Sequence, residues 1–221
     1  MVIKRALIRF ALGAALLAPG AALAGPNLCT GHLAEAERAR GLHEGLLQAI
    51  SVTESGFNGQ PYPWALNLGG RVVYARTHDA AKKILGDRSA NGRKNLYAGC
   101  MQLSVKYHGG AFASLGDLLL PQRNVAYAAR YLASHHEDLG DWQAAVRRYH
   151  GGKPRQSVAY FCRVWRKLAE IRPQTARLLD AGRCGRIPDG DALDVEDAAD
   201  LDVPEIQPAA LTREERRELL S

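Results

Sequence analysis

The 221-residue sequence lacks any apolar run of about 20 residues, the length that a membrane-spanning helix needs. The short apolar run at residues 10–17 follows a basic start and precedes Pro19 and Gly20, and Ala22-Leu23-Ala24 offers a small-x-small cleavage site. We therefore interpret residues 1–24 as a secretory signal peptide cleaved after Ala24, with an uncleaved anchor as the alternative. The mature chain is then expected to be soluble and exported, to the periplasm.

The sequence also lacks the common metal-site motifs. None of its four cysteines forms Cys-x-x-Cys, and His135-His136-Glu137 is not the His-Glu-x-x-His arrangement. We expect no metal and no cofactor, with a zinc site as the alternative use of the cysteines. An even number of cysteines in an oxidising compartment predicts disulfides, and the sequence alone permits three complete pairings. The cysteines are Cys29, Cys100, Cys162 and Cys184.

Acidic residues are scarce in most of the mature chain and concentrated at its end. Residues 25–184 contain 22 Lys and Arg but 12 Asp and Glu, whereas residues 185–221 contain 4 and 11. A cationic exported domain suits an anionic polymer such as cell wall, a membrane surface or nucleic acid. Residues 187–206 hold eight carboxylates and no basic residue, which is typical of a disordered acidic linker. A capping box predicts a short helix over residues 212–220.

Most of the mature chain has the apolar periodicity of helices, so the predicted fold class is mainly α. The expected helices are one capped by Thr30, one over residues 42–55, one from Pro121 to Gly140, one capped by Asp141, one ended by Pro173 and a short one over residues 174–181.

One segment departs from this pattern. Residues 64–75 alternate around Leu68-Gly69-Gly70-Arg71, which predicts a β-hairpin, and Thr77 is expected to cap a short helix after it. We therefore predict one helical domain over residues 25–184, with a small β-hairpin insertion at about 59–95 and a disordered acidic C-terminal tail over 185–221.

Glu54 is the strongest candidate for chemistry. It lies four residues after Ile50 and eight after Leu46, on the apolar face of a helix that Gly56 is expected to end. Burial and the negative end of the helix dipole both raise the pKa of a carboxyl group. A carboxylic acid that stays protonated near neutral pH can protonate a leaving oxygen as a general acid. The alternative is an ordinary half-buried glutamate paired with an arginine.

Three other segments carry suggestive side chains. Gly99-Cys100-Met101-Gln102 predicts a tight turn that presents a thioether and an amide, groups suited to a sugar face and its acetamido substituents. Asn124 and Tyr131-Leu132 lie on one expected helix, and Trp142 begins another that ends in Tyr149-His150-Gly151-Gly152. Singly, each has a plainer explanation: Met101 and Trp142 as core, Tyr149 as a helix end, Gln102 as a loop hydrogen bond.

Taken in order, these segments resemble the soluble-type lytic transglycosylases, whose domain is related to goose-type lysozyme. Their Glu-Ser pair, Gly-x-Met-Gln motif, Asn-(Val/Ile)-x-x-Gly-x-x-Tyr-Leu pattern and Asp-Trp-x-x-Ala…Tyr-Asn-x-Gly stretch are matched by Glu54-Ser55, residues 99–102, residues 124–132 and residues 141–152. The resemblance spans about residues 29–172. Ala128 replaces the usual glycine, and His150 replaces the usual asparagine.

The resemblance implies a lysozyme-like helical fold and cleavage of the β-1,4 bond between N-acetylmuramic acid and N-acetylglucosamine, with a 1,6-anhydro product. Glu54 would act first as acid and then as base, with no metal or cofactor. No second carboxylate lies in a matching motif, whereas hydrolytic glycosidases usually need two. The alternatives are a goose-lysozyme-like hydrolase, a non-catalytic wall-binding module and an exported nucleic-acid binder.

The resemblance also implies roles for further residues. Ser55 and Gln102 would orient the acid and the sugar, Met101 would contact the sugar ring, and Tyr149 would hydrogen-bond near Glu54 or the substrate. His150 would lie at the substrate site and could titrate near neutral pH. The expected partners are peptidoglycan strands, with an envelope-spanning secretion, conjugation, pilus or flagellar machine as a further candidate. We expect a monomer that binds no nucleic acid.

The helix order suggests one cysteine pairing. The helices that end near Arg172 and begin at Pro173 should fold back on each other, and Cys162 and Cys184 lie ten residues before and eleven after that turn. This favours a Cys162–Cys184 disulfide, which leaves Cys29 to pair with Cys100. A buried free thiol at Cys100 is the alternative.

Overall fold

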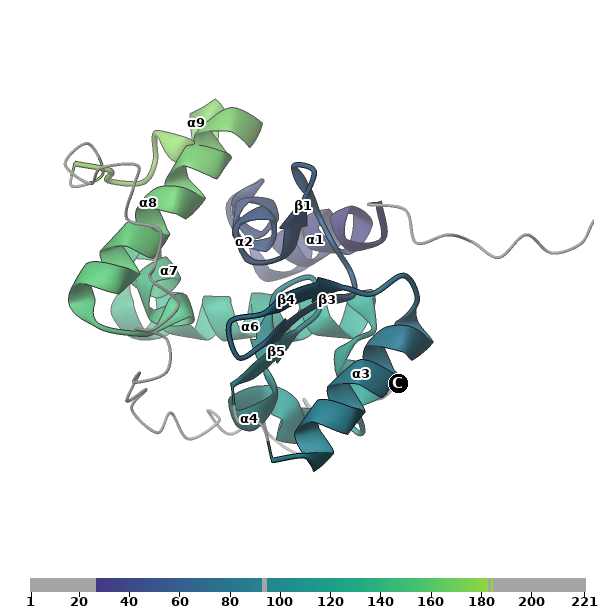
Figure 1. Cartoon of the computed structure of the whole chain (residues 1–221). Coiled ribbons are helices and arrows are strands. Elements are labelled where there is room, and N and C mark those ends of the chain that lie inside the picture. The colour runs from purple at the N-terminus through teal and green to yellow at the C-terminus, as the bar shows by residue number, and fades with distance from the viewer. Residues whose placement is uncertain (1–26, 93–94, 183, 185–221) are drawn as a thin grey trace, which may run out of the picture.

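The computed structural model describes residues 27–92, 95–182 and 184. These residues form a mainly helical domain with a small sheet (Figure 1), which confirms the predicted fold class. The helices are α1 (Asn27–Arg40), α2 (Leu46–Ser55), α3 (His78–Ala90), α4 (Val105–His108), the 3-10 helix η1 (Gly109–Ala111), α5 (Leu115–Leu118), α6 (Pro121–Leu139), α7 (Trp142–His150), α8 (Pro154–Ile171) and α9 (Pro173–Ala176). The predicted signal peptide and acidic tail lie outside the described residues.

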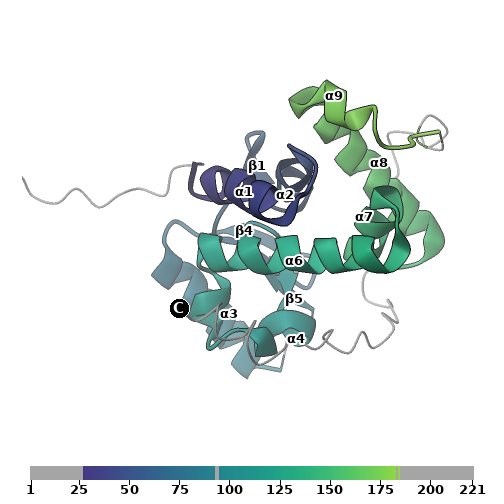
Figure 2. The same ribbon diagram turned by 180° about the vertical axis from the view of Figure 1, so that it is seen from behind.

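The long helix α6 organises the helical part of the domain. Figure 2 shows it running beneath α1 and α2 toward α7, and α8 packs against α2. Pro121 occupies the first turn of α6, and Gly140 ends it in a left-handed conformation, as predicted. Val125, Ala128 and Leu132 recur at helical spacing and are completely buried, so α6 supplies one wall of the main hydrophobic core.

The start of α2 differs from the prediction, because a residue of another helix fixes it. The helix begins at Leu46 rather than at residue 42. The buried carboxylate of Glu37, on α1, accepts hydrogen bonds from the backbone N–H groups of Gly45, Leu47 and Gln48. A carboxylate at a helix N-terminus satisfies free N–H groups and complements the helix dipole. The cap of α2 therefore comes from α1.

Two other helix ends were predicted wrongly. Thr30 does not cap a helix, because α1 already includes Asn27. The last helix among the described residues, α9, spans Pro173–Ala176 and is shorter than the predicted segment 174–181. Thr77 and Asp141 do cap α3 and α7, each accepting a hydrogen bond from a backbone N–H three residues later, as expected.

The predicted hairpin is present but belongs to a larger sheet. Strands β3 (Ala65–Leu68) and β4 (Val72–Tyr74) pair antiparallel, and β3 also pairs with β5 (Leu96–Ala98), which pairs with β6 (Leu103–Ser104). The strands β5 and β6 were not predicted, because two or three residues are too few to show a period. The hairpin is thus continuous with the strands that flank residues 99–102.

A second, smaller hairpin follows α2 directly. Strands β1 (Gly56–Phe57) and β2 (Gln60–Pro61) are joined by Asn58 and Gly59, which both have positive φ, as a tight two-residue hairpin turn requires. Beyond it, Trp64, Leu66 and Leu85 lie in a second hydrophobic core between the sheet, α3 and α5.

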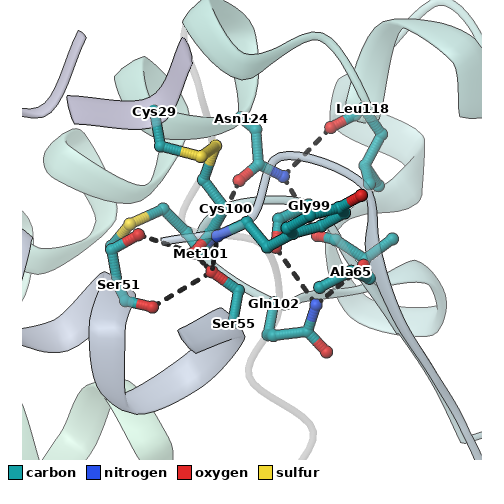
Figure 3. The surroundings of a disulfide bond; sticks show 12 residues. Cys29, Ser51, Ser55, Ala65, Gly99, Cys100, Met101, Gln102, Leu118 and Asn124 are labelled. Carbon is teal, nitrogen blue, oxygen red and sulfur yellow. Dashed lines mark hydrogen bonds between the residues drawn. A yellow bond between two sulfur atoms is a disulfide. The ribbon is translucent and has the colours of Figure 1, made fainter. Parts of the chain in front are cut away.

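Both predicted disulfides are present. Cys162 of α8 pairs with Cys184, and Cys29 of α1 pairs with Cys100, across a sequence separation of 71 residues. The Cα atoms of each pair lie 5.2 Å and 5.9 Å apart, respectively, within the usual range. The second disulfide ties α1 to the turn at residues 99–102 (Figure 3).

Candidate active site

Glu54 lies in the last turn of α2, and Gly56 ends the helix as predicted. The residue as a whole is half-buried, but its carboxyl group lies inside the protein where α2 packs against α8. The hydroxyl of Tyr160, on α8, donates a hydrogen bond of 2.7 Å to Oε1 of Glu54. Tyr160 is itself almost completely buried, so the partner of the acid is shielded from water.

Opposing influences set the charge state of Glu54. Burial disfavours the carboxylate and raises the pKa to about 7, while the Tyr160 hydrogen bond and the positive charge of Arg163 act in the opposite direction. The acid is therefore present in both its protonated and its ionised form near neutral pH. The partner expected under the ordinary-glutamate alternative was an arginine, and here the hydrogen bond comes from a phenol.

The turn at residues 99–102, which we call the Gly99 turn, is held by a buried amide. Asn124 of α6 accepts a hydrogen bond from the Met101 N–H and donates to the carbonyls of Ala98 and Leu118 (Figure 3). Gly99 has φ of +87°, and a Cβ atom there would lie 2.3 Å from Nδ2 of Asn124. A glycine at the start of this turn and an asparagine on α6 are thus required together.

Two serines join the end of α2 to the Gly99 turn. The hydroxyls of Ser51 and Ser55 each donate to the carbonyl of Cys100 at 2.8 Å (Figure 3). Ser55 also accepts a hydrogen bond from the backbone N–H of Tyr62. Ser55 therefore fixes the helix end that carries Glu54, and the hydrogen bonds described for it go to the backbone rather than to the acid.

The side chains of Met101 and Gln102 stabilise the fold in this conformation. The Met101 side chain is completely buried in the main core. The Gln102 side chain donates through Nε2 to the carbonyls of Ala65 and Gly99, which closes the turn against β3. Their contacts with a sugar stay predictions.

Tyr149 and His150, at the end of α7, contact different parts of the site. The Tyr149 hydroxyl donates to the Met101 carbonyl at 3.0 Å. Burial raises the pKa of Tyr149, and the negative charge of the nearby Glu54 adds to the rise. His150 stacks on Tyr160 with ring centroids 4.2 Å apart. Burial, helped by Arg163, lowers the pKa of His150 to about 4, so the titration expected near neutral pH is displaced to acid.

Three residues of this site were not predicted from the sequence: Tyr97, Tyr160 and Arg163. Burial raises the pKa of Tyr97, on β5, and the charge of Glu54 contributes to that shift. Tyr160 lies 106 residues from Glu54 in the chain, within an apolar helix face where it is indistinguishable from core. The guanidinium of Arg163 lies 5.8 Å from the centre of the Tyr160 ring.

The fold and the site together define a helical domain with a desolvated acid held by a phenol at a helix end. The family model described as the Transglycosylase SLT domain matches residues 32–159, more than half of the 221 residues, so the chain belongs to this family. No curated protein and no solved structure matches the chain. The family resemblance found in the sequence is thereby confirmed.

Membership of this family supports a lytic-transglycosylase type of function on peptidoglycan, and with it a place of action outside the cytoplasm. Tyr160 and Arg163 lie just beyond the matched segment. None of the helices that the structure describes is both long and apolar enough to cross a membrane. In the same part of the chain, no three His, Cys, Asp or Glu side chains gather in a metal-binding group.

Proposed function

We propose that this protein is a peptidoglycan lytic transglycosylase that cleaves the β-1,4 bond between N-acetylmuramic acid and N-acetylglucosamine and forms 1,6-anhydromuramoyl ends. The observation that carries the proposal is the state of Glu54, a desolvated carboxyl group with a pKa of about 7 and a hydrogen bond from Tyr160. The family supports the substrate class, and the site supports the chemistry.

In the first step, protonated Glu54 donates its proton to the glycosidic oxygen while the bond from that oxygen to C1 of the muramoyl residue breaks. A general acid is most effective when its pKa lies near the working pH, which holds for Glu54 at neutral pH. The glucosaminyl residue leaves with the proton on its hydroxyl, and positive charge develops at the muramoyl C1.

In the second step, the Glu54 carboxylate takes the proton of the muramoyl 6-hydroxyl, whose oxygen bonds to C1. This closes the 1,6-anhydro ring, restores protonated Glu54 and consumes no water. The Tyr160 hydroxyl and the Arg163 charge both favour the carboxylate, so they stabilise the form of Glu54 that exists between the two steps. One carboxyl group is enough for this cycle.

The surroundings of Glu54 are compatible with a single-carboxyl mechanism. Glycosidases that hydrolyse usually place a second carboxylate across the scissile bond. Four described residues interact electrostatically with Glu54, and none of the four is a carboxylate: Tyr97, Tyr149, Tyr160 and Arg163. We propose that Tyr149, Gln102 and the backbone of the Gly99 turn hold the substrate and that Ser55 orients the helix end, with Met101 as support beneath the turn.

The setting is also a proposal. Residues 1–24 would direct export to the periplasm, and the excess of basic residues over 25–184 suits an anionic wall polymer. A monomeric state, the absence of nucleic-acid binding and a link to an envelope-spanning machine stay predictions.

Mass spectrometry of digested sacculi tests the proposal. The wild-type protein should release anhydromuropeptides, which are lighter by one water than the products of a hydrolase. Glu54→Gln should release none while keeping its fold and its binding to sacculi, because the amide keeps the shape of the acid but cannot cycle a proton. Reducing-end muramic acid as the main product would point to a hydrolase, and lytic activity in Glu54→Gln would exclude Glu54 as the acid.

A further inference from the structure

We propose that His150 is a positioning residue that holds the Tyr160 ring in place for Glu54, and that it is neither a sugar ligand nor a proton carrier. The inference rests on the proposed function for its kinetic consequences, but its structural part concerns three side chains only. The imidazole of His150 stacks on the phenol ring of Tyr160, and the phenol hydroxyl donates a hydrogen bond to Glu54.

The geometry of the stack is the first argument. The two rings are nearly parallel, with an angle of 8° between their planes and 4.2 Å between their centroids. This is the only near-parallel ring contact that involves Tyr160 among the described residues. Ring contacts of this kind favour a defined relative position beyond the area they bury. The contact with the His150 imidazole thus defines the orientation of the Tyr160 ring plane.

The chain brings the two rings together by a short route. His150 is the last residue of α7, and Tyr160 lies in the second turn of α8. Between the helices, Gly151 and Gly152 both have positive φ, which reverses the chain over three residues. The short turn between α7 and α8 thus makes His150 face α8, where the residue is half-buried.

The charge state of His150 is the second argument. Burial and the nearby Arg163 lower the pKa of His150 to about 4, so the imidazole is neutral at the pH where Glu54 titrates. An imidazole whose pKa of about 4 lies well below the pKa of Glu54 is a poor acceptor for the proton of that acid. It can still present a flat, partly apolar face to a phenol.

The placement of the phenol matters because the hydrogen bond to Glu54 is short. The Tyr160 oxygen lies 2.7 Å from Oε1 of Glu54, and a hydrogen bond to a carboxylate weakens steeply when distance and angle change. Without the stacked imidazole of His150, the Tyr160 ring samples more orientations. The carboxylate then loses part of the stabilisation on which the second step depends.

Few other groups could produce the same effect. Around Glu54, α8 contributes Tyr160 and Arg163, α7 contributes Tyr149, and β5 contributes Tyr97. On α1, which also packs against α2, Glu37 bonds to the opposite end of that helix. Tyr160 and Arg163 each interact with both His150 and Glu54, and Tyr160 does so through a ring contact and a hydrogen bond, so we assign the effect of His150 to Tyr160.

Kinetics of His150 variants on purified glycan strands test the role. His150→Ala should lower kcat roughly tenfold, the effect of weakening one hydrogen bond to a charged group, with KM within about twofold. His150→Phe, which keeps a flat ring but no nitrogen, should recover most of the lost turnover, whereas His150→Asn, which has no ring, should not. In a Tyr160→Phe background, His150→Ala should cause no further loss.

A matched control separates positioning from general stability. His136 stacks on Trp142 with centroids 3.8 Å apart and an angle of 10°, at the other end of α7. His136→Ala removes a comparable stack and should change the melting temperature without changing kcat. If His136→Ala lowers kcat as much as His150→Ala, the loss comes from destabilised helices and the inference is wrong.

A titration of Glu54 by carbon-13 NMR tests the structural part without activity. The pKa of Glu54 should rise in His150→Ala and His150→Asn, in the same direction as in Tyr160→Phe, and stay near the wild-type value in His150→Phe. An unchanged pKa in the ring-less variants overturns the inference, as does an increased KM with unchanged kcat, which would make His150 a ligand. A hydrolase product would overturn the proposed function instead and leave this titration interpretable.

Discussion

At the scale of single residues, the site depends on one carboxyl group balanced between two charge states. Burial raises the pKa of Glu54, and Tyr160 and Arg163 limit the rise. A more isolated acid would stay protonated and could not serve as base, whereas an exposed acid would be ionised and could not serve as acid. The pKa of about 7 is compatible with both halves of the proposed cycle.

Tyr160→Phe should shift this balance. Without the phenol hydroxyl, the carboxylate loses its hydrogen bond, so the pKa of Glu54 should rise above about 7. The alkaline limb of the pH profile of kcat/KM should then move to higher pH, and kcat should fall by about tenfold or more. The measurement is lysis of purified sacculi across pH.

Tyr62→Phe is the control for this change. The Tyr62 hydroxyl donates to the carbonyl of Ala75 rather than to Glu54, so its loss should leave the pH profile in place. An unmoved alkaline limb in Tyr160→Phe would mean that the limb reports a group other than Glu54.

The candidate acid could be predicted from the sequence because its signal is local. Glu54 follows Ile50 by one helical turn, and a glycine ends the helix two residues later. Tyr160 could not be predicted in the same way, because its partner lies on a helix far away in the chain. His150 was predicted at the site, but its role depends on the ring that it contacts.

At the scale of elements, local sequence signals predicted the long helices. They did not predict the helix starts and strand pairings that depend on contacts with distant segments of the chain. The ends of α6 and α7 carry their own proline, aspartate and glycine signals. The start of α2 is set by Glu37 on α1, and the pairing of β5 and β6 is set by the Gly99 turn. Such contacts between distant segments leave no period in the sequence.

Glu37→Ala should therefore destabilise the protein strongly. The substitution leaves three backbone N–H groups at the start of α2 without their acceptor, and we expect a loss of roughly 2–4 kcal/mol in the free energy of unfolding. Urea denaturation measures it. Glu35→Ala removes an exposed carboxylate from the same helix and should change the free energy by less than about 0.5 kcal/mol. Similar losses in the two variants would contradict the proposed cap.

At the scale of the whole molecule, the two disulfides should contribute unequally. In the loop-entropy model, closing the 71-residue separation of Cys29 and Cys100 contributes about 4 kcal/mol, and the 22-residue separation of Cys162 and Cys184 about 3 kcal/mol. The first also holds the Gly99 turn against α1.

Replacing Cys29 and Cys100 together by alanine should therefore lower both stability and activity, because the turn carries groups of the proposed site. Replacing Cys162 and Cys184 together should chiefly lower stability. Thermal melts and sacculus lysis on the same samples distinguish the two variants. Equal loss of activity in both, at a temperature where both are folded, would argue against a role of the first disulfide in the site.

Three buried or half-buried histidines give the whole molecule a predictable response to acid. The pKa values of His108, His135 and His150 are each lowered by burial to about 4, below the ordinary value of 6.5. Each histidine binds its proton more weakly in the folded state than in the unfolded state. Its contribution to stability is complete above pH 6.5 and is lost as the pH falls from 6.5 to about 4.

Glu54 acts in the opposite direction over the same range. Its folded-state pKa of about 7 lies above the ordinary 4.5, so its contribution is complete below pH 4.5 and is lost as the pH rises through 7. Between pH 7 and 4.5, protonation of Glu54 therefore offsets part of the loss caused by the histidines. Burial also lowers the pKa of His43 and raises that of Glu37, so four histidines oppose two glutamates. The melting temperature of the wild-type protein should therefore fall on acidification, by on the order of 5 °C between pH 7 and pH 5.

Glu54→Gln removes the opposing group, because an amide does not titrate in this range. Its melting temperature should therefore fall more steeply than that of the wild-type protein between pH 7 and pH 5. Melts of both proteins at matched ionic strength measure the difference in slope. Parallel curves would show that the pKa of Glu54 is not raised in the folded state, and with it the main support for Glu54 as a general acid would be lost.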